Sequence, residues 1–312
     1  MLMEHADWPS LRLEDWEPTY LTLHRWTQIV GKVRLALAPW MNHWWHVPLY
    51  VSSEGLTTHS MPYGGRHLTL TLDFCQHRLV AHSSDKRVEW MELRPMSVAE
   101  SYEGAMALLA KLGVAVRIWP VPVEVVDTTP FARDRVHASY DQGAVERLHR
   151  VLLSTDRVFA LYRGRFVGKT SPVHFFWGAF DLAVSRFSGR RNDRPPPGSV
   201  MGEAYSHEVI SHGFWPGGDW PIGGRVEGPV FYGYAVPEPA GFAQAEVRPR
   251  QARYSPKLGE FLLDYEEVRT ADRPDQVLLT FLESSYRAAA ELAGWNIHEL
   301  EHPHAALAQG TR

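Results

Sequence analysis

The sequence predicts an α+β fold, with a large antiparallel sheet built from two similar halves and helices packed on one side. Three observations support this prediction. Short segments that alternate apolar and polar residues, as half-buried strands do, recur in both halves of the chain. Longer segments with apolar residues at helical spacing stand near the beginning and end of each half. The matching segments also follow one another in the same order.

The first half is predicted to begin with a helix over residues 11–30, where apolar residues recur at helical spacing and Gly31 follows. Alternation then predicts strands at 33–37, 45–51, 56–61, 68–74, 77–83 and 88–93, the second and third forming a hairpin. The next helix has a clear start, because Ser97 and Glu100 can form a capping box, and it ends near Gly113. Residues 114–126 add one or two short strands.

The second half is predicted to repeat this order. A helix covers residues 145–162, and Gly168-Lys169 follows it as Gly31-Lys32 follows the first helix. Further short matches pair His174-Phe-Phe-Trp177 with His43-Trp-Trp-His46, 230–236 with 56–61, Leu263-Asp-Tyr265 with Leu72-Asp-Phe74, and Ser285-Tyr286 with Ser101-Tyr102. They predict an internal duplication with repeats at 1–134 and 135–312 in one compact domain, and insertions at 188–229 and 240–257. Chance similarity between two α+β halves is the alternative.

Size and composition narrow the class of protein. The chain has 312 residues, a 45% apolar share and a net charge of -4, as ordinary soluble globular proteins do. This charge gives no basis for binding nucleic acid or membrane surfaces, and Cys75 is the only cysteine. We therefore expect a cytoplasmic bacterial protein with no signal peptide and a small-molecule ligand. The one basic cluster is interpreted as a solvated loop, and it comprises Arg186, Arg190, Arg191 and Arg194.

The candidate site is a dense group of ionisable residues in the second half. Residues 203–212 read Glu-Ala-Tyr-Ser-His-Glu-Val-Ile-Ser-His, with two carboxylates, two imidazoles and a phenol. Ionisable groups this close together are costly to bury unless they are paired, hydrogen-bonded or bound to a metal. Upstream, His174 and Asp181 lie within an apolar run. Alternation favours one strand for each segment, although helical spacing also fits both.

An antiparallel pairing of these two strands would bring specific side chains together. A symmetric register sets Asp181 opposite Glu208 and Trp177 opposite His212, and directly opposed side chains lie about 5 Å apart. A one-residue slip replaces Glu208 with His207. Asp181 and His212 with Glu208, or with His207 in its place, could hold a divalent metal. The expected ligands are His207, Glu208 and Asp181. The carboxylate pair could instead work without a metal, with one member as a general acid.

Aromatic residues complete the predicted site, because tryptophans cluster around residues 40–45 and 215–220 and favour an aromatic-walled cavity. The catalytic candidates are Asp181, His207, Glu208 and Tyr205, and the substrate-binding candidates are His174, Trp177, Trp215, His43 and Trp45. Three functions stay open: a small-molecule enzyme, a non-catalytic protein that binds a small ligand, and a hydrogen-bonded lock of an inserted loop. Taken singly, His174 also fits a core histidine and Asp181 a structural acceptor.

Several motifs resemble those of a bacterial family described only as a domain of unknown function. They are Asn42-His-Trp-Trp45, Gly55-Leu-Thr-Thr58, Pro62-Tyr-Gly64, Ser171-Pro-Val-His-Phe-Phe-Trp-Gly178, Phe180-Asp-Leu182, Arg186-Phe-Ser-Gly-Arg190, Glu203-Ala-Tyr-Ser-His-Glu208 and Gly213-Phe-Trp-Pro-Gly217. The resemblance extends from Trp8 to His302. It implies a soluble single-domain protein, and it supplies neither a reaction nor catalytic residues.

Overall fold

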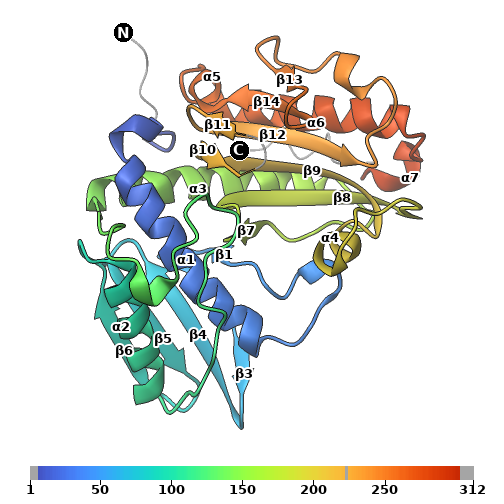
Figure 1. Ribbon diagram of the computed structural model, residues 1–312. Coiled ribbons are helices and arrows are strands. Elements are labelled where there is room, and N and C mark those ends of the chain that lie inside the picture. The colour runs from blue at the N-terminus through green and yellow to red at the C-terminus, as the bar shows by residue number, and fades with distance from the viewer. Residues whose placement is uncertain (1–5, 222–223, 303–312) are drawn as a thin grey trace.

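The computed structural model describes residues 6–221 and 224–302, which form two antiparallel sheets of six strands each (Figure 1). The first sheet has the order β1-β2-β4-β5-β6, and β3 pairs with β4. Its strands are β1 (Tyr50–Val51), β2 (Gly55–Thr57), β3 (Met61–Tyr63), β4 (Arg66–Asp73), β5 (Arg78–Ser83) and β6 (Val88–Glu92). The predicted α+β class is confirmed, with two sheets in place of one.

The second sheet has the order β13-β14-β12-β9-β8-β7. Its strands are β7 (His174–Phe176), β8 (Asp181–Arg191), β9 (His207–Trp215), β12 (Val230–Val236), β13 (Arg253–Ser255) and β14 (Glu260–Asp264). Leu49 and Phe175 exchange backbone hydrogen bonds of 2.8 and 2.9 Å, so the two sheets meet beside β1 and β7. A separate hairpin joins β10 (Gly218–Trp220) to β11 (Gly224–Val226).

Helices cover the sheets unevenly. In Figure 1, α3 and α6 lie along one face of the second sheet, α2 covers the first sheet, and α1 runs between the sheets. The helices are α1 (Glu17–Leu37), α2 (Val98–Lys111), α3 (Gln142–Gly164), α4 (Ser199–Ala204), α5 (Tyr265–Arg269), α6 (Pro274–Leu292) and α7 (Ile297–Leu300). Short 3-10 turns are η1 (Leu13–Asp15), η2 (Asn42–Trp44), η3 (Phe131–Arg133) and η4 (Phe242–Gln244). None of the described helices is long and apolar enough to cross a membrane.

Local signals located several elements correctly. The predicted capping box at the start of α2 is present, since the Ser97 hydroxyl accepts from the Glu100 N–H at 3.2 Å and Glu100 accepts from the Ser97 N–H at 3.0 Å. The strands β4, β5, β6 and β12 and the helix α3 also lie where alternation and helical spacing placed them, whereas the strands of the predicted hairpin are short, at 50–51 and 55–57. All of the correctly placed elements except β6 bury an apolar face, whereas Val88 and Trp90 of β6 are exposed.

The expected strand at 33–37 is wrong, because α1 continues through Gly31 to Leu37. Gly31 is present for close packing: a Cβ there would lie 2.2 Å from the ring of Trp177. Residues 114–126 form no strand in the described chain. Their backbone is held by a side chain instead, since the Gln28 amide bonds both the N–H and the C=O of Val123 at 2.8 Å.

Only some of the proposed matches between the two halves fall at equivalent places: Asp73 and Asp264 each end a strand, and Ser101 and Ser285 each lie on a helix. Gly31-Lys32 lies inside α1, whereas Gly168-Lys169 follows the end of α3. Residues 188–229, expected as an insertion, contain β9, which lies between β8 and β12 in the second sheet. What the two halves share is a six-stranded antiparallel sheet with long helices beside it.

Candidate functional site

The second sheet has two different faces, and its register assigns residues to each. Ser185, Ser211 and Tyr234 are neighbours across β8, β9 and β12, and Leu262 on β14 lies opposite Tyr232. Because side chains alternate along a strand, this face, which we call the polar face, carries Asp181, Ser185, Ser211, Tyr232, Tyr234 and Glu260. The opposite face, which we call the helix face, lies against α3 and α6 and carries Arg186, Glu208 and His212.

Strands β8 and β9 are antiparallel, as expected, but the predicted register is wrong. Val184, rather than Trp177, lies opposite His212, which is a shift of seven residues. Two local features cause the shift. The apolar run folds into the hairpin β7-β8 around residues 177–180, with Phe180 at a positive φ of 61°. Glu203 belongs to α4 rather than to the strand, so β9 begins later and extends to Trp215.

Three carboxyl groups from separate segments meet at the polar face. Asp181 is 8% exposed and accepts a hydrogen bond from the Tyr232 hydroxyl. Burial, with repulsion from Glu124, raises the pKa of Asp181 to about 7. Burial, with repulsion from Asp181, raises the pKa of Glu260 to about 8, and burial raises the pKa of Glu124. Within the described residues, none of these carboxylates has a Lys or Arg nitrogen within 4.0 Å.

Glu124 reaches this group from the connection between the two halves of the chain. A Cβ on Gly178 would lie 2.3 Å from a Glu124 carboxylate oxygen, so the glycine leaves room for that side chain. Glu124 nevertheless stays exposed to solvent. The backbone of Glu124 has a positive φ of 56°, a conformation that non-glycine residues adopt at some energetic cost. The Glu124 carboxyl group therefore approaches the polar face, where burial raises its pKa, although the residue as a whole is exposed.

Hydroxyl groups connect the carboxyl groups to the rest of the face. The hydroxyls of Tyr205 and Tyr234 lie 2.9 Å apart, as do those of Ser185 and Ser211. Burial raises the pKa of Tyr205 to about 12 and that of Tyr234 further, so both phenols keep their protons near neutral pH. A row of neutral hydroxyls can donate and accept hydrogen bonds, which suits a ligand that itself carries hydroxyl groups.

Basic and aromatic side chains occupy the other end of the polar face, beyond Ser185. Lys169 Nζ lies 2.6 Å from His43 Nε2, and 5.4 and 5.2 Å from the ring centres of Trp45 and Phe187. The ring of His207 lies 5.5 Å from that of His43. We call Lys169, His43, His207, Trp45 and Phe187 the basic end. Burial lowers the pKa of His43 and His207, which favours their neutral imidazoles, and it lowers the pKa of the Lys169 ammonium group, an effect that Glu203 opposes.

His174 lies on β7 beside the basic end. It is 1% exposed, and its ring contacts those of Trp45, Tyr50 and Phe176. Burial lowers the pKa of His174 to about 3, so the imidazole is neutral at pH 7. Its Nε2 has no hydrogen-bond partner among the described residues. A buried nitrogen without a partner costs free energy, and a bound ligand or water can supply the missing bond.

Glu208 lies away from the polar face. Its carboxylate accepts a hydrogen bond of 2.9 Å from the Ser188 hydroxyl and forms an ion pair of 2.7 Å with Arg190. Arg190 also donates hydrogen bonds to the carbonyls of Ala293 and Gly294, just after the end of α6. The predicted metal ligands Asp181, His207 and Glu208 therefore do not form one site. Within the described residues, no group of three or more His, Cys, Asp or Glu could hold a metal ion.

Trp177 and Trp215 are part of the packing around the site. Trp177 lies beneath Gly31 of α1 and donates from Nε1 to the Val47 carbonyl at 2.8 Å. Trp215 packs beside Tyr232 and against Trp220, with ring centres 6.1 Å apart.

On the helix face, His212 and Arg186 are structural. Tyr162 bonds His212 Nδ1 at 3.2 Å, Ser285 bonds Nε2 at 2.8 Å, and burial lowers the pKa of His212 to about 3. Arg186 was expected in a solvated loop, but it is fully buried, with its guanidinium 3.4 Å from the ring centre of Tyr162 and 4.4 Å from that of Tyr286. The strand β8 extends through Arg186 and places it beneath α3 and α6.

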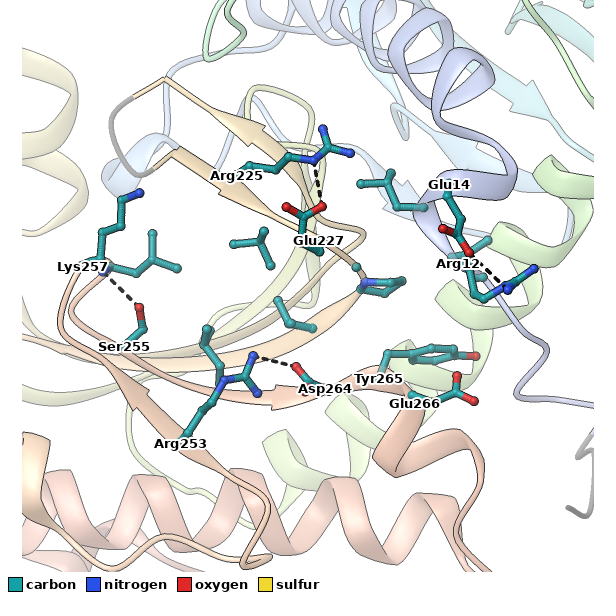
Figure 2. Close-up of a pocket in the computed structure, with 18 of the residues that line it drawn as sticks. Arg12, Glu14, Arg225, Glu227, Arg253, Ser255, Lys257, Asp264, Tyr265 and Glu266 are labelled. Carbon is teal, nitrogen blue, oxygen red and sulfur yellow. Dashed lines mark hydrogen bonds and ion pairs between the residues drawn. The ribbon is translucent and has the colours of Figure 1, made fainter.

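A separate hollow of about 820 Å³ lies between β11, the β13-β14 hairpin and the N-terminal segment (Figure 2). Its charges are largely paired with one another: Arg253 with Asp264 at 2.8 Å, and Arg225 with Glu227 at 3.0 Å. None of the nine residues predicted for the site is in its described lining. The polar face is the better candidate site because its carboxyl groups lack such partners.

Several residues of the polar face had not been expected. Tyr232 and Tyr234 alternate within the predicted strand 230–236, so the sequence could have placed both on one face. The sequence pattern placed Lys169 only in the Gly-Lys dipeptide that occurs at 31–32 and at 168–169. Glu124 and Glu260 gave no signal, because their meeting with Asp181 depends on long-range packing.

The fold and the polar face define an α+β protein with a carboxylate- and tyrosine-bearing sheet face. Its chain belongs to the family described as a family of unknown function, DUF5996, which matches residues 8–302. No curated protein and no solved structure matches the chain. The resemblance found in the sequence is thereby confirmed.

Proposed function

We propose that the polar face is the active site of an enzyme that transfers protons to and from a small hydroxylated molecule. One observation carries this proposal: Asp181 lies close enough to Glu124 and to Glu260 for their charges to interact, no cation lies beside them in the described chain, and burial raises the pKa of each. Such an arrangement weakens folding and is expected where carboxyl groups have a chemical task.

The roles of the carboxyl groups follow from their pKa values. Burial raises the pKa of Asp181 to about 7 and that of Glu260 to about 8, so near neutral pH the pair holds a proton between them. One group can then accept a proton while the other donates one, as general base and general acid. Since each carboxylate repels the other, ionisation of one favours the protonated form of its neighbour.

The substrate class follows from the surrounding side chains. Tyr205, Tyr234, Ser185 and Ser211 offer hydroxyl groups along the face. Tyr232 orients Asp181 by donating to its carboxylate. Neutral donors and acceptors in a row match the hydroxyl groups of a sugar or another polyol.

Non-catalytic binding is the second candidate, and one observation favours it. His174 Nε2 lies buried without a partner in the described chain, among the rings of Trp45, Tyr50 and Phe176. An aromatic group with a single orienting polar atom is typical of ligand pockets. A binding protein would hold its ligand there and release it unchanged.

A screen of hydroxylated metabolites by thermal shift tests the proposal, followed by NMR of any compound that binds. We expect a compound that stabilises the wild-type protein and is converted over time. Asp181→Asn and Glu260→Gln should lose conversion, whereas the matched control Asp264→Asn should keep it, because Asp264 lies on the same strand as Glu260 but pairs with Arg253. Binding without conversion would support the binding protein instead. Equal conversion by Asp181→Asn would contradict the proposal.

A further inference from the structure

We infer that the basic end is a subsite for an anionic group of the ligand, a phosphate or a carboxylate, held by Lys169 and His207, with His43 positioning the lysine. The inference rests on the proposed function, since it extends the substrate of the polar face to an elongated polyol with an acidic group. Phe187 and His207 of the basic end are carried by the same face of β8 and β9 as Asp181.

The protonation of His43 leaves the Lys169 ammonium group free to donate. His43 Nδ1 lies 3.2 Å from the Ala204 carbonyl oxygen, which can only accept, so Nδ1 carries the ring proton. Nε2 then accepts from Lys169 at 2.6 Å. An ammonium group has three protons to donate, and this bond uses one. The other two remain for a ligand.

The charge balance of this end also favours an anion. Within the described residues, neither Lys169 nor Arg191 has a carboxylate within 4.0 Å. Arg191 lies opposite His207 in the sheet, and its charge lowers the pKa of that histidine. Among the described residues, the carboxylate that raises the pKa of Lys169 is that of Glu203. One of its oxygens already accepts a hydrogen bond of 3.1 Å from the backbone N–H of His43. The positive charges of Lys169 and Arg191 are therefore not balanced by Glu203, which already accepts a hydrogen bond from His43.

The position of Lys169 is fixed by aromatic packing rather than by an ion pair. Its ammonium group lies over Trp45 and Phe187, and its backbone carbonyl accepts from the Phe187 N–H at 3.0 Å. Cation–π contacts hold a charged group in place without neutralising it. His43 itself adopts a positive φ of 57° in η2, which brings its ring to the lysine. A charged group that is held but not neutralised is suited to anion binding.

The spacing along β8 indicates the size of the ligand. Asp181 and Phe187 are six residues apart on one strand, or about 20 Å between Cα atoms. Since side chains extend inward from both ends, a substrate that reaches both is an elongated molecule with its acidic group at one end. Inorganic phosphate or malonate can still occupy the basic end alone, which makes each a simple probe.

Titration of the full chain with inorganic phosphate, and separately with malonate, tests the inference at constant ionic strength. The ring signals of ¹⁵N-labelled His43 and His207 report on the site. We expect at least one probe to shift both signals with saturation, and the tighter probe identifies the anionic group. Lys169→Gln should weaken that binding at least 10-fold, and Lys169→Arg should keep most of it. Lys257→Gln, which alters a lysine in the separate hollow, should not change it.

The outcomes separate this inference from the proposed function. Asp181→Asn should bind the probe as the wild-type protein does, because its carboxyl group lies at the far end of the face. If conversion of metabolites is never found but the probe binds in this pattern, the anion subsite stands alone. If neither probe shifts His43 and His207 in the wild-type protein, or if Lys257→Gln weakens binding as much as Lys169→Gln, the inference is wrong.

Discussion

The helix face and the polar face of the second sheet bury charged and titratable side chains in opposite ways. On the helix face, both nitrogens of His212 have hydroxyl partners, and Arg186 lies between aromatic rings beside Glu283 at 3.4 Å. On the polar face, the Asp181 and Glu260 carboxyl groups repel each other. The first arrangement stabilises the fold, while the second costs stability, and this difference locates the candidate site.

The largest expected effect is on the helix face. Arg186→Ala should lower the free energy of unfolding by about 3 to 5 kcal/mol, because it removes a fully buried side chain and leaves Glu283 without this partner. Urea denaturation measures the change. Arg190→Ala removes an exposed arginine from the same strand and should lower the free energy of unfolding by about 1 kcal/mol or less. Similar losses for the two variants would break the contrast between the buried and exposed arginines.

The second effect is a gain in stability rather than a loss, and its size depends on pH. The pKa of Asp181 is raised from 3.8 to about 7 in the folded protein, so the folded state binds that proton more tightly than the unfolded state. The contribution of Asp181 to stability should therefore fall as pH rises through this window, while the buried imidazoles of His174 and His212 contribute in the opposite direction. Asp181→Asn removes only the Asp181 contribution, so its stability relative to wild type should grow through the window and reach about 4 kcal/mol at pH 8. A difference between Asp181→Asn and wild type that stays constant over this window would contradict the assignment.

A smaller effect concerns the hydrogen bond between Tyr232 and Asp181. The phenol donates to the carboxylate and stabilises its ionised form, which lowers the pKa of Asp181. Tyr232→Phe should therefore raise that pKa by about one unit above the wild-type value. Tyr234→Phe should change it less, since the Tyr234 hydroxyl bonds Tyr205 instead. A carboxyl NMR titration of both variants distinguishes the two tyrosines.

The smallest effects distinguish neighbouring residues on opposite faces. Glu208→Ala should cost about 1 kcal/mol or less, since its ion pair with Arg190 is partly exposed, and it should leave probe binding at the basic end unchanged. His207→Ala should cost even less stability but weaken that binding. Thermal shift with and without phosphate measures both. Reversed results would place Glu208, rather than His207, at the site.

Much of the fold could be predicted because local chemistry decides it. Apolar alternation gave β12 its limits at 230–236, and Ser97 with Glu100 marked the start of α2. Gly31 misled the prediction, since its role is to admit the Trp177 ring rather than to end a helix.

The candidate site was harder to predict, because its residues meet through register and packing. Asp181, Tyr205 and His207 do lie along the polar face, but alternation alone could not reveal the seven-residue shift caused by α4. Local sequence also contains nothing that brings Glu124 to Asp181, since Gln28 of α1 anchors that segment. His207 and Glu208 illustrate the remaining limit: neighbours in sequence, they act on opposite faces.

The most direct test is the pKa of the Asp181 carboxyl group. ¹³C NMR of labelled aspartate side chains, with the Asp181 signal assigned by its absence in Asp181→Asn, follows this group from about pH 4 to about pH 9. The account predicts a midpoint of about 7 in the wild-type protein. A midpoint near the ordinary value of 3.8 would show that the polar face does not hold its proton at neutral pH and would contradict the proposed acid–base site.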